Sequence, residues 1–189
     1  MTELVIRRAT LDDAHFLLPL IDRAGEGLPM YFWDQVAEPG QNGRDVGLAL
    51  VQSEDAGISY KNAWIAEFGG RTSGCLIAYQ KTEEAREIDE DLPPMLRPIV
   101  ELENQALGTG YIYVLSTVAE MRGRGIGTSL LSFAEKFRGP NGMSLLVADN
   151  NTGARSLYER HGYHAHDSRE MIKNGWQSDG HNWVLMIKE

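Results

Sequence analysis

The sequence predicts an α/β (α+β) fold built on a mixed central sheet of about seven strands with flanking helices. The run from Tyr111 to His161 alternates strand, helix, strand and helix, which implies a parallel βαβ unit. The apolar runs "NAWIAEF" and "SGCLIAYQ" flank "GGRT", which is typical of an antiparallel hairpin with a four-residue turn. Because both kinds of pairing are expected, the sheet is mixed. A chain of 189 residues fits one domain, 1–189.

The first half of the chain begins with a strand and continues with helices. "LVIRRA" predicts the strand, and Thr10 with Asp13 forms a capping box before the helical run "AHFLLPLIDRA". Pro19 and the glycines of "GEGLPMYFW" predict that this first helical region is split into two pieces by a loop. A short helix is expected around "VGLALVQ", before the hairpin.

The second half alternates strands and helices after a charged stretch. "KTEEAREIDEDLPP" gathers Glu83, Glu84, Glu87, Asp89, Glu90 and Asp91, which is typical of a solvated loop; the alternative is a docking surface for cations. "PMLRPIVELENQAL" predicts a helix that Pro98 bends or delays. The remaining expected elements are the strand "YIYVLSTV", a helix ending near Phe137, the strand "SLLVAD", the helix "NTGARSLYERHG" and strands near "HDSREMIK" and "NWVLMIK".

Composition and charge narrow the classes of function. No apolar run reaches the roughly 20 residues of a membrane span, and the N-terminus does not resemble a secretory signal, so no membrane association and a cytoplasmic location are expected. The net charge of −9 argues against nucleic-acid binding. The single cysteine, Cys75, excludes an intrachain disulfide and is expected to pack in the core.

The stretch "RGRGIG", residues 122–127, stands between the strand "YIYVLSTV" and a helix with an apolar stripe. The first N–H groups of a helix have no intrahelical partner and lie at the positive end of the helix dipole, so they bind anions. Arg122 and Arg124 add charge, and residues 121–162 carry a net +3 against −12 for the rest of the chain. This pattern favours a phosphate-binding turn; the alternative is that the glycines only permit a tight turn.

Spacing narrows the choice of phosphate compound. A dinucleotide-binding Gly-x-Gly-x-x-Gly pattern fails from Gly123, where Thr128 occupies the last position, and from Gly125, where Leu130 does. The chain contains no Gly-x-x-x-x-Gly-Lys-Ser/Thr run, so ATP hydrolysis loses its main support.

The spacing Arg122-x-x-Gly125-x-Gly127 resembles the pyrophosphate-binding signature of the GNAT superfamily of acyl-CoA-dependent N-acyltransferases. Downstream, "NTGARSLYERHGY" resembles the second signature of that family, with Asn151, Ala154, the pair Leu157–Tyr158, and Gly162 before Tyr163. The two signatures occur in the family's order, and the resemblance covers most of the chain.

The resemblance implies a GNAT fold whose central parallel strands splay apart, with acetyl-CoA as co-substrate between them. The backbone of Leu115, Ser116 and Thr117 would pair with the pantetheine arm. The pyrophosphate would lie on Arg122, Gly123, Arg124, Gly125, Ile126, Gly127 and Thr128.

Two residues of the second signature receive roles by resemblance. Tyr158 would be the general acid that protonates the departing CoA sulfur; the alternative is a core aromatic residue. Asn151 would hold the pantetheine end of the cofactor; a helix N-cap is the other interpretation, and both can hold.

The general base is left open. Some relatives that acetylate protein N-termini carry a Glu five residues before the motif asparagine, where this chain has Leu146. The remaining candidates are Glu103, Tyr113 and Glu26, acting directly or through water.

The resemblance implies direct transfer of an acetyl group to a primary amine of a small molecule or peptide, without a metal. The histidines 161, 164 and 166 are therefore expected to be solvated or hydrogen-bonded rather than metal ligands. Tyr31, Phe32 and Trp33 could wall the acceptor pocket or face the core. A noncatalytic acyl-CoA sensor is the alternative function, and a homodimer is the expected oligomer.

Overall fold

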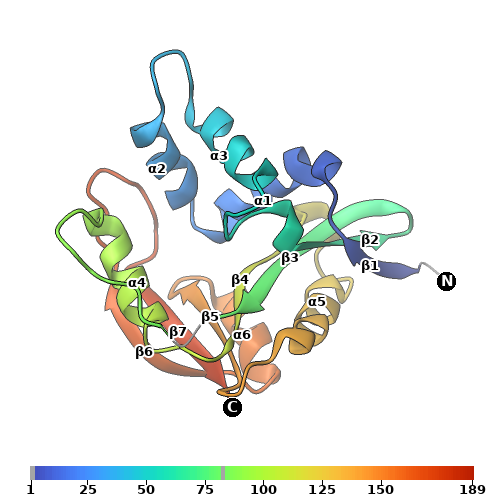
Figure 1. Ribbon diagram of the computed structural model, residues 1–189. Coiled ribbons are helices and arrows are strands. Elements are labelled where there is room, and N and C mark those ends of the chain that lie inside the picture. Colours follow the sequence, from blue (N-terminus) through green and yellow to red (C-terminus); the bar gives the residue numbers. More distant parts are fainter. Residues whose placement is uncertain (1–2, 82–83) are drawn as a thin grey trace. The chain divides into compact units, whose positions relative to one another are not determined.

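The computed structural model describes residues 3–81 and 84–189 (Figure 1). Its seven strands form one sheet in the order β1-β2-β3-β4-β5-β7-β6. β4 and β5 pair in parallel, whereas β1 with β2, β2 with β3, and β7 with β5 and β6 pair antiparallel. The predicted mixed α/β sheet is confirmed. The strands are β1 Leu4–Arg8, β2 Ala63–Phe68, β3 Arg71–Gln80, β4 Gly110–Thr117, β5 Met143–Ala148, β6 His164–Glu170 and β7 Asn182–Lys188.

The chain divides into two compact units, which are described one at a time. One consists of Met1–Ala78 with Tyr113–Ala134, and the other of Tyr79–Ile112 with Glu135–Glu189. The α-helices of the first unit are α1 Ala14–Ala24, α2 Leu28–Val36, α3 Gly43–Gln52 and α5 Ile126–Ala134; those of the second are α4 Arg97–Glu103 and α6 Thr152–Arg160. That residues 1–189 act as one domain stays a prediction.

The first helical region is split, as predicted, but only the glycines divide it. Pro19 lies inside α1, which continues to Ala24, and α2 begins after Gly27, whose φ is +77°. α1, α2 and α3 contact one another. The Trp33 ring packs on Gly47, where a Cβ would overlap the indole. Trp33 is therefore the core-facing member of the three consecutive aromatic residues.

The β2–β3 hairpin differs from the sequence prediction in the length of its turn. Only Gly69 and Gly70 separate the strands, and Phe68 pairs with Arg71, so the turn has two residues rather than four. Both glycines have positive φ, +59° and +73°. This conformation matches the twist of a tight hairpin and leaves Arg71 and Thr72 free to extend β3.

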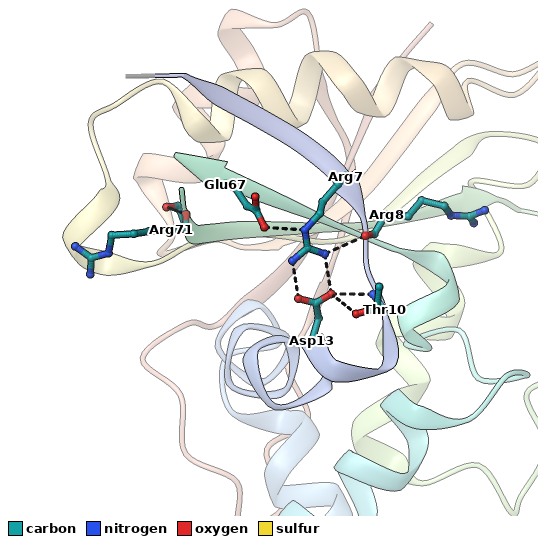
Figure 2. A network of polar contacts seen from close by, with 7 residues as sticks. Arg7, Arg8, Thr10, Asp13, Glu67 and Arg71 are labelled. Carbon is teal, nitrogen blue, oxygen red and sulfur yellow. Dashed lines mark hydrogen bonds and ion pairs between the residues drawn. The ribbon is translucent and has the colours of Figure 1, made fainter. Parts of the chain in front are cut away.

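A half-buried ion-pair network ties β1 to β2 and to the turn that precedes α1 (Figure 2). The Arg7 guanidinium donates two hydrogen bonds to the Asp13 carboxylate, of 2.8 and 2.9 Å, and a third of 2.7 Å to Glu67. Asp13 also accepts from the backbone N–H and the hydroxyl of Thr10, which is the predicted capping box. These hydrogen bonds hold the pKa of Asp13 below its usual value, and those from Arg7 contribute most.

In the second unit, β7 lies between β5 and β6, and α4 contacts this part of the sheet. α4 begins at Arg97, after a 3₁₀ turn at Pro94–Leu96, so Pro98 lies in its first turn and the helix is delayed, as predicted. β6 begins at His164, two residues before the predicted strand, and ends at Glu170. Of the predicted acidic loop, residues 84–91 are exposed, and Glu83 lies outside the described residues.

We predict that Asp13→Asn lowers the free energy of unfolding at pH 7 by about 2 kcal/mol, since charged hydrogen bonds are lost in a buried place. Because the folded-state pKa of Asp13 is lowered, its contribution is complete above the unfolded value near 3.8 and is lost as the pH falls below it. Urea unfolding at pH 7 and at pH 3 measures both effects. The exposed neighbour supplies the control, Asp12→Asn. Equal stabilities of the two variants at pH 7 would contradict the prediction.

Candidate functional site

The residues predicted to bind pyrophosphate form one continuous turn in the first unit. After the 3₁₀ turn Ala119–Met121, Arg122 is extended, and Gly123 and Gly125 have φ of +74° and +78°. α5 then begins at Ile126, whose side chain is buried together with that of Leu130. The predicted apolar stripe of this helix thus fixes its first turn, while residues 122–125 remain exposed.

The geometry of this turn suits an anion. The Ser129 N–H donates to the carbonyl of Gly125, which is the first i→i−4 hydrogen bond of α5. The N–H groups of residues 126–128 come before it and have no such partner within the helix. A Cβ at Gly123 or Gly125 would have open space within 4 Å, so both backbones can be approached closely. The Arg124 guanidinium lies 5.8 Å from the centre of the Phe68 ring, on β2. The turn therefore combines N–H donors without intrahelical partners, glycine backbone that a ligand can approach, and a positive charge positioned by an aromatic ring.

The strand before the turn supplies the other predicted cofactor residues of this unit. In β4, Ser116 is buried, whereas Leu115 and Thr117 are half-buried, in keeping with strand alternation. Gly74 packs against the carbonyl of Ser116, where a Cβ would approach to 2.8 Å. Cys75 is fully buried, and burial raises the pKa of its thiol to about 12, so it is no nucleophile at neutral pH.

The second signature lies in the other unit, on α6. Asn151 is the N-cap of this helix: its side-chain oxygen accepts from the Ala154 N–H at 3.2 Å. The Tyr158 ring is buried, its centre 6.0 Å from that of Tyr163. Burial raises the pKa of Tyr158 to about 12, so its hydroxyl stays protonated at neutral pH.

Of the candidate bases, Glu103 has the most distinctive surroundings. One carboxylate oxygen accepts from the Tyr111 hydroxyl at 2.9 Å, and the other is 3.0 Å from the Lys81 ammonium. The ammonium also lies 4.9 Å from the centre of the Tyr111 ring. Both oxygens thus have donors, and a proton could reach Glu103 through the Tyr111 hydroxyl. Sequence reasoning missed Tyr111 as a partner of Glu103, for which its place on β4, eight residues after Glu103, was the available signal.

The other candidates lie elsewhere. Glu26, in the first unit, belongs to the glycine break between α1 and α2 and has a φ of +56°. Tyr113, on β4, is 40% exposed, whereas Ile112 and Val114 beside it in the strand are buried. In the second unit, Leu146 is the one half-buried residue of β5.

The described residues hold no group of three or more His, Cys, Asp or Glu side chains that could bind a metal ion. His161 bonds through Nδ1 to the carbonyl of Leu157, as expected of a hydrogen-bonded histidine, and His164 and His166 are exposed on β6. Within the same residues, no helix has the length and apolar character to cross a membrane.

Comparison with known families gives the class of protein. The model of the acetyltransferase (GNAT) domain matches residues 59–165, which is more than half of the chain, so the chain belongs to this family. The matched range contains both predicted signatures. A comparison with curated proteins found no match.

Solved structures agree in fold. A crystal structure described as an acetyltransferase is 21% identical, covers 98% of each chain and has a TM-score of 0.64. An N-acetyltransferase from Staphylococcus aureus Mu50 is 20% identical over 97% of this chain and 99% of its own, with a TM-score of 0.63. Arabidopsis thaliana Naa50, bound to the bisubstrate analogue CoA-Ac-MVNAL, is 17% identical over 98% of each chain, with a TM-score of 0.55.

We predict that Gly125→Ala lowers the free energy of unfolding by about 1 kcal/mol, since an alanine at φ +78° is strained even where there is space. Gly153→Ala is the matched control: it also has open space around its Cβ, but it lies in α6, where alanine is favoured by up to about 1 kcal/mol. Chemical denaturation of both variants measures the difference. A Gly125→Ala protein as stable as Gly153→Ala would contradict the described turn.

Proposed function

We propose that this protein is an N-acetyltransferase that moves the acetyl group of acetyl-CoA to a primary amine by direct attack. Membership of the GNAT acetyltransferase family supports acetyl transfer. The observation that carries the choice of cofactor is the turn at residues 122–127, in which residues 122–125 are exposed, two positive-φ glycines stand just before α5, and arginines occupy 122 and 124.

In this proposal the diphosphate of CoA accepts hydrogen bonds from the backbone of Gly123, Gly125 and Gly127 and from Ile126 and Thr128. Arg122 and Arg124 neutralise its charge. The backbone of Leu115, Ser116 and Thr117 pairs with the pantetheine arm, and Asn151 holds the end of that arm while it caps α6.

The reaction forms one C–N bond and breaks one C–S bond. The amine lone pair attacks the thioester carbonyl, the tetrahedral intermediate collapses, and the electron pair of the C–S bond leaves on sulfur. Tyr158 gives its proton to this sulfur, for which its raised pKa keeps it in the required protonated form. The amine proton passes to a base, for which Glu103, by way of the Tyr111 hydroxyl, and Glu26 are the candidates.

The acceptor of this reaction is an amine of a small molecule or a peptide. The Naa50 structure contains an analogue that joins CoA to a peptide, which supports a peptide amine among the substrates to be tried. A cytoplasmic location and a homodimer are parts of the same proposal.

We predict that Arg122→Ala weakens CoA binding about tenfold, because one charge-assisted contact is lost. Gly125→Glu should weaken it about a hundredfold or more, since it adds bulk, strain and a like charge at the diphosphate. Titration calorimetry with CoA measures both. Arg44→Ala, which removes an exposed arginine from α3, is the control and should bind CoA as the wild type does. Unchanged affinity in the first two variants would refute the turn as the diphosphate site.

We predict that Tyr158→Phe lowers kcat about a hundredfold and changes the CoA affinity little, as expected for the loss of a general acid. Because an acid works below its pKa, and the pKa of Tyr158 is about 12, its ionisation should cause no loss of wild-type activity between pH 8 and 10. Rates of CoA release against an amine panel give both results. If the wild type bound acetyl-CoA tightly but acetylated no amine of a broad panel, the chain would be a sensor rather than an enzyme.

A further inference from the structure

In the second unit, the indole of Trp183 carries a buried hydrogen-bond donor without an acceptor. The residue is 4% exposed, and its Nε1 atom has no hydrogen-bond partner. A buried donor that has lost its water and gained no partner costs about 1–3 kcal/mol. Proteins retain few such groups, and each calls for an explanation such as a ligand that the donor meets in another state.

Trp183 lies at the end of the sheet where a ligand is expected. It pairs with Ala148, the last residue of β5, and β5 runs parallel to β4. In sheets of this kind, ligands bind at the carboxyl ends of the parallel strands. Asp149, the next residue, accepts from the His181 N–H and the Asn182 side chain, which fixes the start of β7 against this end.

One residue on the face that carries Trp183 is half-buried. Residues directly opposite each other in paired strands share a face, which places Trp183 with Ala148, and Leu185 with Leu146. Ser144, which pairs with Tyr111, lies on this face as well, because side chains alternate along β5. Leu146 is the diagonal neighbour of Trp183 and the only residue of β5 that is not buried. Trp183, which carries the unpartnered donor, therefore lies beside the half-buried residue of this strand.

The segment between β6 and β7, residues 171–181, covers this donor. Its Trp176 ring stacks on that of Trp183 with centres 6.0 Å apart and planes within 3°. A Cβ at Gly180 would come within 3.0 Å of the Asn150 side-chain oxygen, so the segment closes against the residues that follow β5. Asn174 and Gly175 have positive φ, which places two turn residues just before Trp176.

We propose that the Trp183 N–H recognises an oxygen atom of the acceptor, and that the enzyme accordingly prefers amines with a carbonyl oxygen close to the nitrogen, such as amino-acid amides and peptides. The inference rests on the proposed acetyl transfer and adds the substrate class. An indole N–H is a neutral donor that binds no ammonium group, so it selects against alkylamines and polyamines that lack an acceptor oxygen. Segment 171–181 moves aside as the oxygen takes its place.

Trp183→Phe tests the donor, because it keeps an aromatic ring and removes only the N–H together with part of the ring area. The acceptors are leucinamide and isoamylamine, which differ by the carboxamide alone. For leucinamide we expect kcat/KM to fall about tenfold relative to the wild type, which corresponds to one lost hydrogen bond. For isoamylamine the ratio of variant to wild type should stay within about twofold. The ratio for each acceptor cancels the difference in basicity between the two amines.

Trp176→Phe is the control, since it alters the stacked pair and keeps the Trp183 N–H. It should change kcat/KM for the two acceptors by the same factor. Trp183→Phe should be at least as stable as Trp176→Phe, because it removes an unsatisfied donor. Equal effects of Trp183→Phe on leucinamide and isoamylamine would overturn the inference.

A binding measurement separates this inference from the proposed function. Calorimetry of leucinamide with the CoA-saturated protein reports recognition without turnover. Wild type that binds leucinamide about tenfold more tightly than Trp183→Phe supports the inference even if no amine is acetylated, in which case only the proposed function fails. Equal leucinamide affinities of the two proteins overturn it, whatever the activity.

Discussion

The parallel pairing of β4 with β5 is the constraint from which the candidate site follows. Parallel neighbours cannot be joined by a tight turn, so the chain must cross over between the end of β4 and the start of β5. It does so through the stretch 118–125 and α5. A helix that follows the carboxyl end of a strand presents unpaired N–H groups at its start, and here Gly123 and Gly125 expose them while Ile126 and Leu130 anchor the helix.

Charge and burial then divide the chemical roles. In an acidic chain, the arginines at 122 and 124 give an anion a local reason to bind at the turn. Burial acts in a different way on the neutral acids: it raises the pKa of both Cys75 and Tyr158 to about 12. The thiol is thereby inert, whereas a phenol that stays protonated is what a general acid requires. Burial therefore argues against Cys75 as a nucleophile and suits Tyr158 as a general acid.

Much of the fold could be predicted because apolar periodicity and glycine placement are local properties. The strand and helix order, the split after α1 and the glycine turn before α5 all follow from such signals. The predicted hairpin turn was too long. Composition alone does not distinguish Gly69 and Gly70, which have the positive φ of a tight turn, from the glycines of an ordinary loop. β6 began earlier than predicted because its exposed polar residues, such as His164, carry no alternating pattern. The hydrogen-bond partners of Glu103 are Lys81 and Tyr111, and no local sequence pattern links these residues. The unpartnered N–H of Trp183 is likewise a property of packing, which the sequence does not display.

In the proposed function, the backbone of residues 123–128 binds the diphosphate of CoA. Amide NMR spectra of the ¹⁵N-labelled protein, recorded during a titration with CoA and then with pantetheine, test it most directly. We expect CoA to shift the amide signals of Gly123, Gly125 and Gly127 strongly, and pantetheine, which has no diphosphate, to leave them in place. If the amides of this turn did not respond to CoA while others in the chain did, the diphosphate would bind elsewhere.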